Sequence, residues 1–129
     1  MTSLDMSEVL AWARVLERAG DDVVDEGKKV VAKGSLNVKN EARQLAPRGP
    51  HIPSYASSIG YDVTTGAGWI EGEIGPVKGR RQWGLGNLLE YGSANNPPHP
   101  HHEPALDHEE PRFIAACEAL AAELVTRHG

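Results

Sequence analysis

The chain has 129 residues, a length typical of one domain with a single modest core. Its formal net charge of −5 argues against a sequence-independent nucleic-acid binder, which normally carries a basic surplus. Cys117 is the only cysteine, which excludes an intrachain disulfide and indicates synthesis in a reducing cytosol. The sequence contains neither an apolar run long enough to span a membrane nor a signal-peptide hydrophobic region, so it predicts a soluble protein.

Residues 5–46 are predicted to be helical, in two helices. Asp5 and Glu8 have the spacing of an acidic capping box, which predicts the start of the first helix. Apolar residues then recur on one helical face as far as Gly20, namely Val9, Trp12, Ala13 and Leu16. This segment is therefore predicted to be an amphipathic helix.

The second predicted helix is long, from Asp21 or Asp22 up to Pro47, because apolar residues keep helical spacing throughout. Gly27 and Gly34 lie on its apolar face, and each lowers helix propensity by about 1 kcal/mol relative to Ala. Either another backbone approaches closely at these glycines, or the helix breaks near Gly34. The pattern favours one helix.

A β-hairpin is predicted over residues 55–75. Residues 55–64 alternate between apolar or aromatic and small or polar side chains, which is the period of a half-buried strand. Residues 65–68 contain two glycines and predict a turn, and residues 69–74 form the returning strand with Ile70 and Ile74 on one face.

Residues 76–104 are predicted to be extended loops. The segment 77–86 is rich in glycine and carries Lys78, Arg80, Arg81 and Trp83. It is either a solvated loop or a contact arm, since Arg and Trp are enriched at interface hot spots. Nucleic-acid contact through its three basic side chains is the weaker alternative.

The last predicted helix covers residues 104–127. Its apolar stripe consists of Phe113, Cys117, Leu120, Ala121 and Leu124. Pro111 either lies in the first turn or kinks a helix that began near Pro104. Cys117 lies on the stripe and is predicted to be a packed core thiol. The chain as a whole is therefore predicted to be a single α+β domain, residues 1–129.

Histidines and acidic residues crowd between residues 99 and 109, where His101, His102 and His108 are weak candidates for metal ligands. His101 and His102 are adjacent, so their side chains are predicted to diverge, and we expect no metal site. Neither a nucleophile motif nor a phosphate-binding loop occurs in the sequence. We therefore expect no catalytic residues and no cofactor, and predict that the protein is not an enzyme.

Several short motifs of this sequence occur in an order that resembles the pattern of a known protein family. A helix ends in Ala46-Pro47, a strand opens with the sequence YASSI at residues 55–59, and LEYGS follows at residues 89–93. A proline-rich loop then leads to PALD at residues 104–107, which opens the last helix. This pattern resembles the tail-completion and head–tail joining (neck) proteins of long-tailed bacteriophages (siphophages).

The sequence departs from the family pattern in two places. Where the family has Thr-Gly-x-Leu after Ala-Pro, this chain has the proline-rich residues 49–55. Where the family has Pro-Phe-Leu before the last helix, this chain has Pro100, His101 and His102. Two titratable rings thus replace an apolar anchor, which suggests a polar or pH-sensitive contact.

The resemblance implies a structural virion protein at the neck, the head-proximal end of the tail, made in the host cytoplasm. It implies a homo-oligomeric ring, a hexamer by analogy, that contacts connector or portal-side proteins and tail-tube or tail-terminator proteins. DNA would only pass through the channel, and an acidic lumen would suit that passage. The expected interface residues are Lys78, Arg80, Arg81, Trp83, Leu89, Glu90, Tyr91, His99, His101 and His102.

Three other functions stay open at this point. A tail-terminator ring uses the same kind of small α+β subunit. A small metal-dependent enzyme would use the cluster of histidines and carboxylates. A toxin-like or regulatory nucleic-acid binder would act through Lys78, Arg80 and Arg81.

Overall fold

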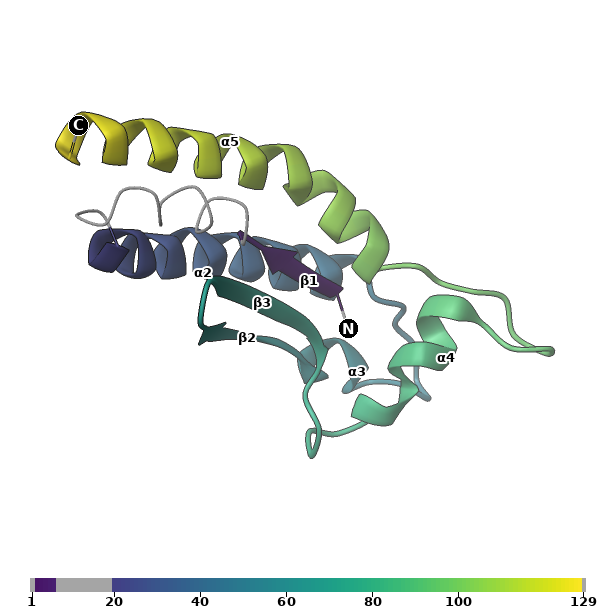
Figure 1. Cartoon of the computed structure of the whole chain (residues 1–129). Helices are drawn as coiled ribbons and strands as arrows, with labels where there is room; N and C mark the ends of the chain where they lie inside the picture. The colour runs from purple at the N-terminus through teal and green to yellow at the C-terminus, as the bar shows by residue number, and fades with distance from the viewer. Residues whose placement is uncertain (1, 7–19, 129) are drawn as a thin grey trace.

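The computed structural model describes residues 2–6 and 20–128, which form an α+β fold (Figure 1). Two long helices lie side by side, and an antiparallel sheet packs against the first of them. The elements in chain order are β1 (Thr2–Asp5), α2 (Gly20–Leu45), α3 (Tyr55–Ser58), β2 (Ile59–Gly66), β3 (Trp69–Pro76), α4 (Gly86–Tyr91) and α5 (His102–His128). A single 3-10 turn, Trp83–Leu85, precedes α4.

The prediction of one long helix is confirmed by α2, which runs unbroken through both glycines. Gly27 is needed for close packing. A Cβ added there would lie 2.8 Å from both Ile70 Cδ1 and Met6 Sδ. Gly27 therefore marks close approach of the sheet side of the core, and the helix does not break at Gly34.

The prediction that a helix starts at Asp5 is wrong. Asp5 is the last residue of β1 and not the cap of a helix, and β1 pairs antiparallel with β3. The sheet therefore has three strands, in the order β1-β3-β2. The pairing joins Leu4 to Gly72 across a long sequence separation, so no local pattern indicates it. The rest of the predicted first helix, residues 7–19, lies outside the described residues.

The hairpin is confirmed, but its first strand begins later than predicted. Residues 55–58 form the short helix α3, because the Ser57 hydroxyl donates to Ser54 O (2.9 Å) and the Ser58 hydroxyl donates to Tyr55 O (2.6 Å). Such local bonds compete with strand formation. β2 and β3 then pair from Ile59 opposite Pro76 to Gly66 opposite Trp69.

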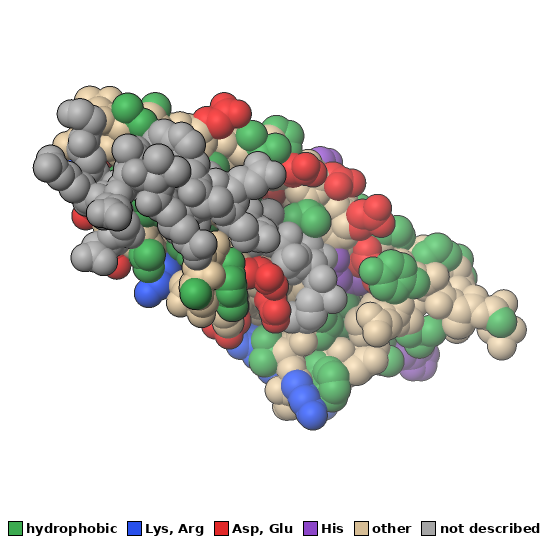
Figure 2. All heavy atoms as spheres, viewed as in Figure 1, with side chains coloured by type: hydrophobic (Ala, Val, Ile, Leu, Met, Phe, Trp, Pro, Cys, Tyr) green, Lys and Arg blue, Asp and Glu red, His purple; other side chains and the backbone are tan. Residues whose placement is uncertain are grey.

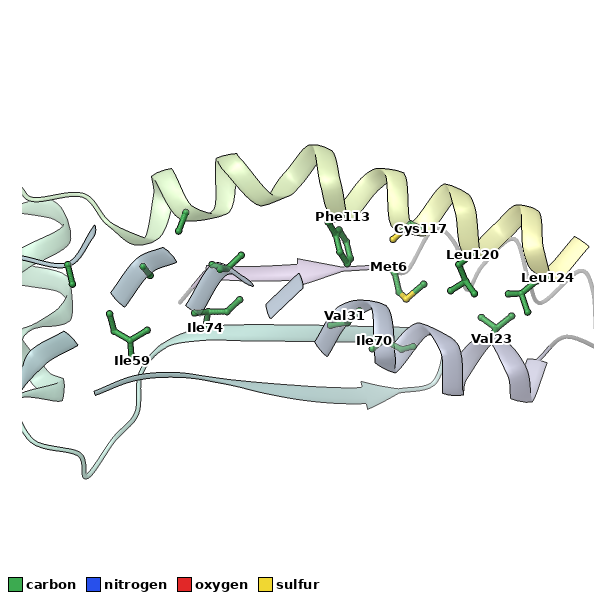
Figure 3. Packing of buried hydrophobic residues seen from close by; sticks show 14 of the residues in the cluster. Met6, Val23, Val31, Ile59, Ile70, Ile74, Phe113, Cys117, Leu120 and Leu124 are labelled. Atoms are coloured by element: carbon green, nitrogen blue, oxygen red, sulfur yellow. The ribbon is translucent and has the colours of Figure 1, made fainter. Parts of the chain in front are cut away.

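The core lies between α5, α2 and the inner face of the sheet (Figure 3). Phe113, Cys117, Leu120 and Leu124 of α5 point toward α2, as their spacing predicts. The sheet contributes buried side chains from alternate positions, which are Ile59, Ile70 and Ile74. Cys117 is buried, and burial raises the pKa of its thiol, as does the nearby Glu118. The thiol is therefore held in its neutral form.

The second half of the chain contains more helix than predicted. Residues 86–91 form α4 within the segment expected to be extended loop. α5 begins at His102 and contains Pro111, so the alternative with proline inside a longer helix is correct. Among the described residues, no helix is both long and apolar enough to cross a membrane.

Gly72 of β3 lies directly against α2, and a Cβ at that position would come within 1.9 Å of Ser35 Oγ. We expect Gly72→Ala to lower the free energy of unfolding by about 1–3 kcal/mol through overpacking. Ser35→Ala should cost little, because its buried hydroxyl has no hydrogen-bond partner in the described structure.

The double variant Ser35→Ala/Gly72→Ala should recover part of the loss, because the clashing oxygen is gone while the contact of the added Cβ with Val31 Cγ1, at 3.0 Å, remains. Urea unfolding of the four proteins in the cycle measures this coupling. Strictly additive losses would show that the two positions do not touch as the structure has them.

Candidate functional site

Glu90 ties the end of α4 to the start of α5. Its carboxylate accepts backbone N–H groups of three successive residues: His101 (3.0 Å), His102 (2.9 Å) and Glu103 (3.3 Å). These are N–H groups that a helix N-terminus leaves without intrahelical partners. Although the side chain comes from another helix, its charge also suits the positive end of the α5 dipole. Glu90 therefore caps the N-terminus of α5 from another helix of the same chain.

The carboxylate is buried, with Glu90 only 5% exposed. Burial by itself raises its pKa. The three backbone N–H groups and His101 lower it, and the net pKa lies below the ordinary value for a glutamate. Glu90 is thus a buried anion at neutral pH, stabilised by hydrogen bonds to its charged form.

His101 is fully buried, and both of its ring nitrogens have partners. Nε2 lies 2.6 Å from the Tyr55 hydroxyl, while Nδ1 lies 2.8 Å from His99 O and 3.0 Å from Glu90 Oε1. Because Nδ1 faces two acceptors, it carries the proton, and Nε2 accepts from Tyr55. Burial and the nearby Glu90 charge raise the pKa of Tyr55, so its hydroxyl stays protonated.

His102 is also buried, but neither of its ring nitrogens has a hydrogen-bond partner in the described structure. Its ring centroid lies 4.4 Å from that of His101, at an interplanar angle of 42°. Burial, and secondarily the neighbouring His101, lower the pKa of His102 to about 4 despite the opposing effect of Glu90. The imidazole is therefore neutral at neutral pH.

A pocket with a volume of about 240 Å³ lies beside this cluster. Its walls come from the end of β3, the 3-10 turn and α4, and both Trp83 and Tyr91 border it. Glu90 and His102 line it as well. The pocket therefore gives the buried cluster a route toward solvent.

This arrangement corrects the prediction that adjacent histidines diverge. The start of α5 turns both rings of His101 and His102 inward, and their ligand atoms lie within 4.8 Å of one another and of a Glu90 oxygen. His108 does not join them. It lies exposed on α5, and its Nδ1 is 2.6 Å from Glu41 Oε1.

The predicted interface residues divide into three groups by their exposure. Glu90, His101 and His102 are buried in the chain's own fold, so they are not available on its surface. Leu89 is half-buried. The remaining six are exposed, and Tyr91, at 73%, is the most exposed large hydrophobic side chain among the described residues: Lys78, Arg80, Arg81, Trp83, Tyr91 and His99.

Tyr55 is the functional-site residue that sequence reasoning missed. Its place in an alternating run predicted a strand position, whereas it lies in α3 with its hydroxyl on His101. A usable signal was present, because a buried tyrosine normally finds a partner for its hydroxyl. The polar residues near Tyr55 in the sequence do not indicate that the partner of its hydroxyl is His101, 46 residues away.

Comparisons with protein-family models, with curated proteins and with solved structures found no match to this chain. The functional argument therefore depends on the residues, on their arrangement, and on the resemblance in motif order. Of these, the arrangement around Glu90 carries the most chemical detail.

Proposed function

We propose that the chain is a structural subunit of the head–tail interface of a long-tailed bacteriophage, where a ring of copies joins or completes the tail at the neck. The ring is a hexamer by analogy with the family that the sequence resembles. Its partners are a connector or portal-side protein on one side and a tail-tube or tail-terminator protein on the other. DNA passes through the channel without being bound.

The observation that supports this proposal most is the bond network of Glu90. The resemblance depends on two short motifs, LEYGS at residues 89–93 and PALD at residues 104–107, separated by a loop. Glu90 of the first accepts hydrogen bonds from the helix start that leads into the second, and Ala105 there is fully buried. Two motifs that act as one structural unit are better evidence than two independent short matches.

The loop that joins the two motifs forms an exposed arm suited to contacts between subunits. Residues 93–100 are all exposed and extend away from the body of the molecule beyond α4 (Figure 1). The return of the arm is fixed by His99 N, which donates to Leu89 O at 2.7 Å. Because its base is fixed, less conformational entropy would be lost when a neighbour binds it.

The surface around the pocket offers further contacts. Trp83 is 40% exposed, and Tyr91 borders the same pocket. Lys and Arg side chains occupy the nearby end of the molecule, and acidic side chains are spread along α5 (Figure 2). A head-to-tail ring requires two such different, complementary surfaces.

The decisive experiment asks whether the protein is in the particle. Mass spectrometry of purified virions should detect the chain at about six copies per particle, as one hexameric ring requires, and antibody labelling should place it at the neck. Labelling at the neck supports a joining ring and a tail-terminator ring alike, whereas labelling elsewhere along the tail would contradict both. Absence from virions that package DNA and carry complete tails would refute the proposal.

Trp83 tests the proposed contact surface. Trp83→Ser should weaken subunit or partner binding by about 2 kcal/mol, roughly 30-fold in affinity, as expected for an aromatic hot spot. Trp69→Ser is the matched control, because Trp69 is equally exposed at 40% but lies at the hairpin turn, away from α4. Incorporation into particles from complementing plasmids measures the effect. Equal incorporation of the two variants would place the contact surface elsewhere.

A further inference from the structure

We propose that Glu90, His101 and His102 form a binding site for one divalent transition-metal ion of the zinc class. The three residues meet at the start of α5, and each offers a ligand atom within 4.8 Å of the others. This site is independent of the role in the virion, so either proposal can fail without the other.

The first observation that supports this metal site is that the ring nitrogens of His102 have no hydrogen-bond partner in the described structure. His102 is 8% exposed, and both its nitrogens are buried without a partner in the described structure. A buried polar atom without a partner is uncommon in folded proteins and calls for an explanation, such as an ion. A metal ion between His102 and Glu90 would satisfy one nitrogen directly.

Glu90 retains the capacity to bind a metal although it caps α5. Its Oε1 accepts two N–H groups, whereas Oε2 accepts, from the described residues, only the longer bond from Glu103, at 3.3 Å. An ionised carboxylate oxygen has two lone-pair positions, so Oε2 has one left for an ion. The negative charge of Glu90 also offsets the positive end of the α5 dipole, which would otherwise repel a cation.

His101 is already oriented as a ligand would be. Its Nδ1 lies 3.0 Å from Glu90 Oε1, so it lies beside the Glu90 carboxylate, close enough for Nδ1 and the oxygen that is left, Oε2, to bind one ion. With Nδ1 on the metal, the ring proton moves to Nε2, which then donates to the Tyr55 oxygen 2.6 Å away. Metal-bound histidines usually donate their second N–H to such a partner, which fixes the ring.

The donor set selects the kind of ion. Two imidazoles and one carboxylate suit Zn²⁺ and its neighbours Co²⁺ and Ni²⁺, whereas Mg²⁺ and Ca²⁺ prefer oxygen ligands alone. Three protein ligands leave a fourth position, and Glu90 and His102 both border the pocket of about 240 Å³. A water molecule fits there. The ion can enter by the same route.

Titration of the whole chain, pretreated with a chelator, tests the site. Isothermal calorimetry with Zn²⁺ should give one site per chain with micromolar or tighter affinity. Co²⁺ should give the intense visible absorption of a four- or five-coordinate ion. His102→Leu should weaken Zn²⁺ binding by at least about 100-fold, since outer-shell changes alone cost about 10- to 100-fold. His108→Leu, at an exposed histidine of the same helix, should leave the affinity unchanged.

Nuclear magnetic resonance of the unaltered chain gives an answer that does not depend on any variant folding. Zn²⁺ should shift the ring resonances of His101 and His102 at one equivalent, before those of the exposed His51, His99 and His108. Zn²⁺ that first shifts the exposed histidines, or binds His102→Leu as tightly as the unaltered chain, would overturn the proposal. So would the absence of any binding.

Discussion

Glu90→Ala is expected to lower the free energy of unfolding by about 3 kcal/mol or more. The substitution removes the acceptor of three backbone N–H groups at the start of α5. Loss of an ordinary helix cap costs about 0.5–2 kcal/mol, and hydrogen bonds to a charged group are worth about 1.5–3 kcal/mol each. Since small domains are stable by only about 5–15 kcal/mol, this single change removes a large share of the total.

Urea unfolding followed by circular dichroism measures the loss, and two variants show its origin. Glu90→Gln keeps the shape and two acceptor lone pairs but loses the charge, so it should cost less than Glu90→Ala. Glu110→Ala removes an exposed glutamate of α5 and should change stability by less than about 0.5 kcal/mol. If Glu90→Ala is no worse than Glu110→Ala, the carboxylate does not cap α5.

The parts of the fold that the sequence predicted are those set by local patterns. Helical periodicity predicts the apolar stripes of α2 and α5. Alternation of side chains and the glycines of the turn predict the hairpin, again within one segment of the chain. β1 could not be found this way, because it is held by pairing with β3 across the chain. α4 is only six residues long, too short for a helical period to show.

The candidate site was predicted only as a list of residue types. Adjacent side chains diverge along an extended chain, and that reasoning dismissed His101 and His102 as partners. The chain instead turns into α5 between them, and Glu90 fixes that turn by holding both backbone N–H groups. A carboxylate that binds backbone eleven or more residues away leaves no periodic signal.

Acid should destabilise the metal-free protein well before its carboxylates titrate. The folded-state pKa of His102 is lowered from 6.5 to about 4. Between these values the unfolded chain binds a proton that the native chain does not, so stability falls as the pH falls. The full loss is about 3–4 kcal/mol, at about 1.4 kcal/mol per pKa unit. Among the described residues, the titratable groups that face His102 are His101 and Glu90.

Glu90 acts in the same direction at lower pH. Its folded-state pKa is lowered too, so its stabilisation is present above the unfolded value and is lost as the pH falls through the folded one. Between pH 6.5 and about 5 the decline therefore belongs mainly to His102. Urea unfolding in the presence of a chelator, at pH 7.5, 6 and 5 or thereabouts, should show it.

His102→Leu separates this histidine from every other titrating group, because leucine can occupy the buried position without binding a proton. The variant should lose most of the slope between pH 6.5 and 5 and be more stable than the unaltered chain at the acidic end. His51→Leu removes an exposed histidine and should keep the slope. An unchanged slope in His102→Leu would mean that His102 is protonated as readily in the folded chain as in the unfolded one. In that case its ring has a partner or solvent contact that accepts the charge, contrary to its burial.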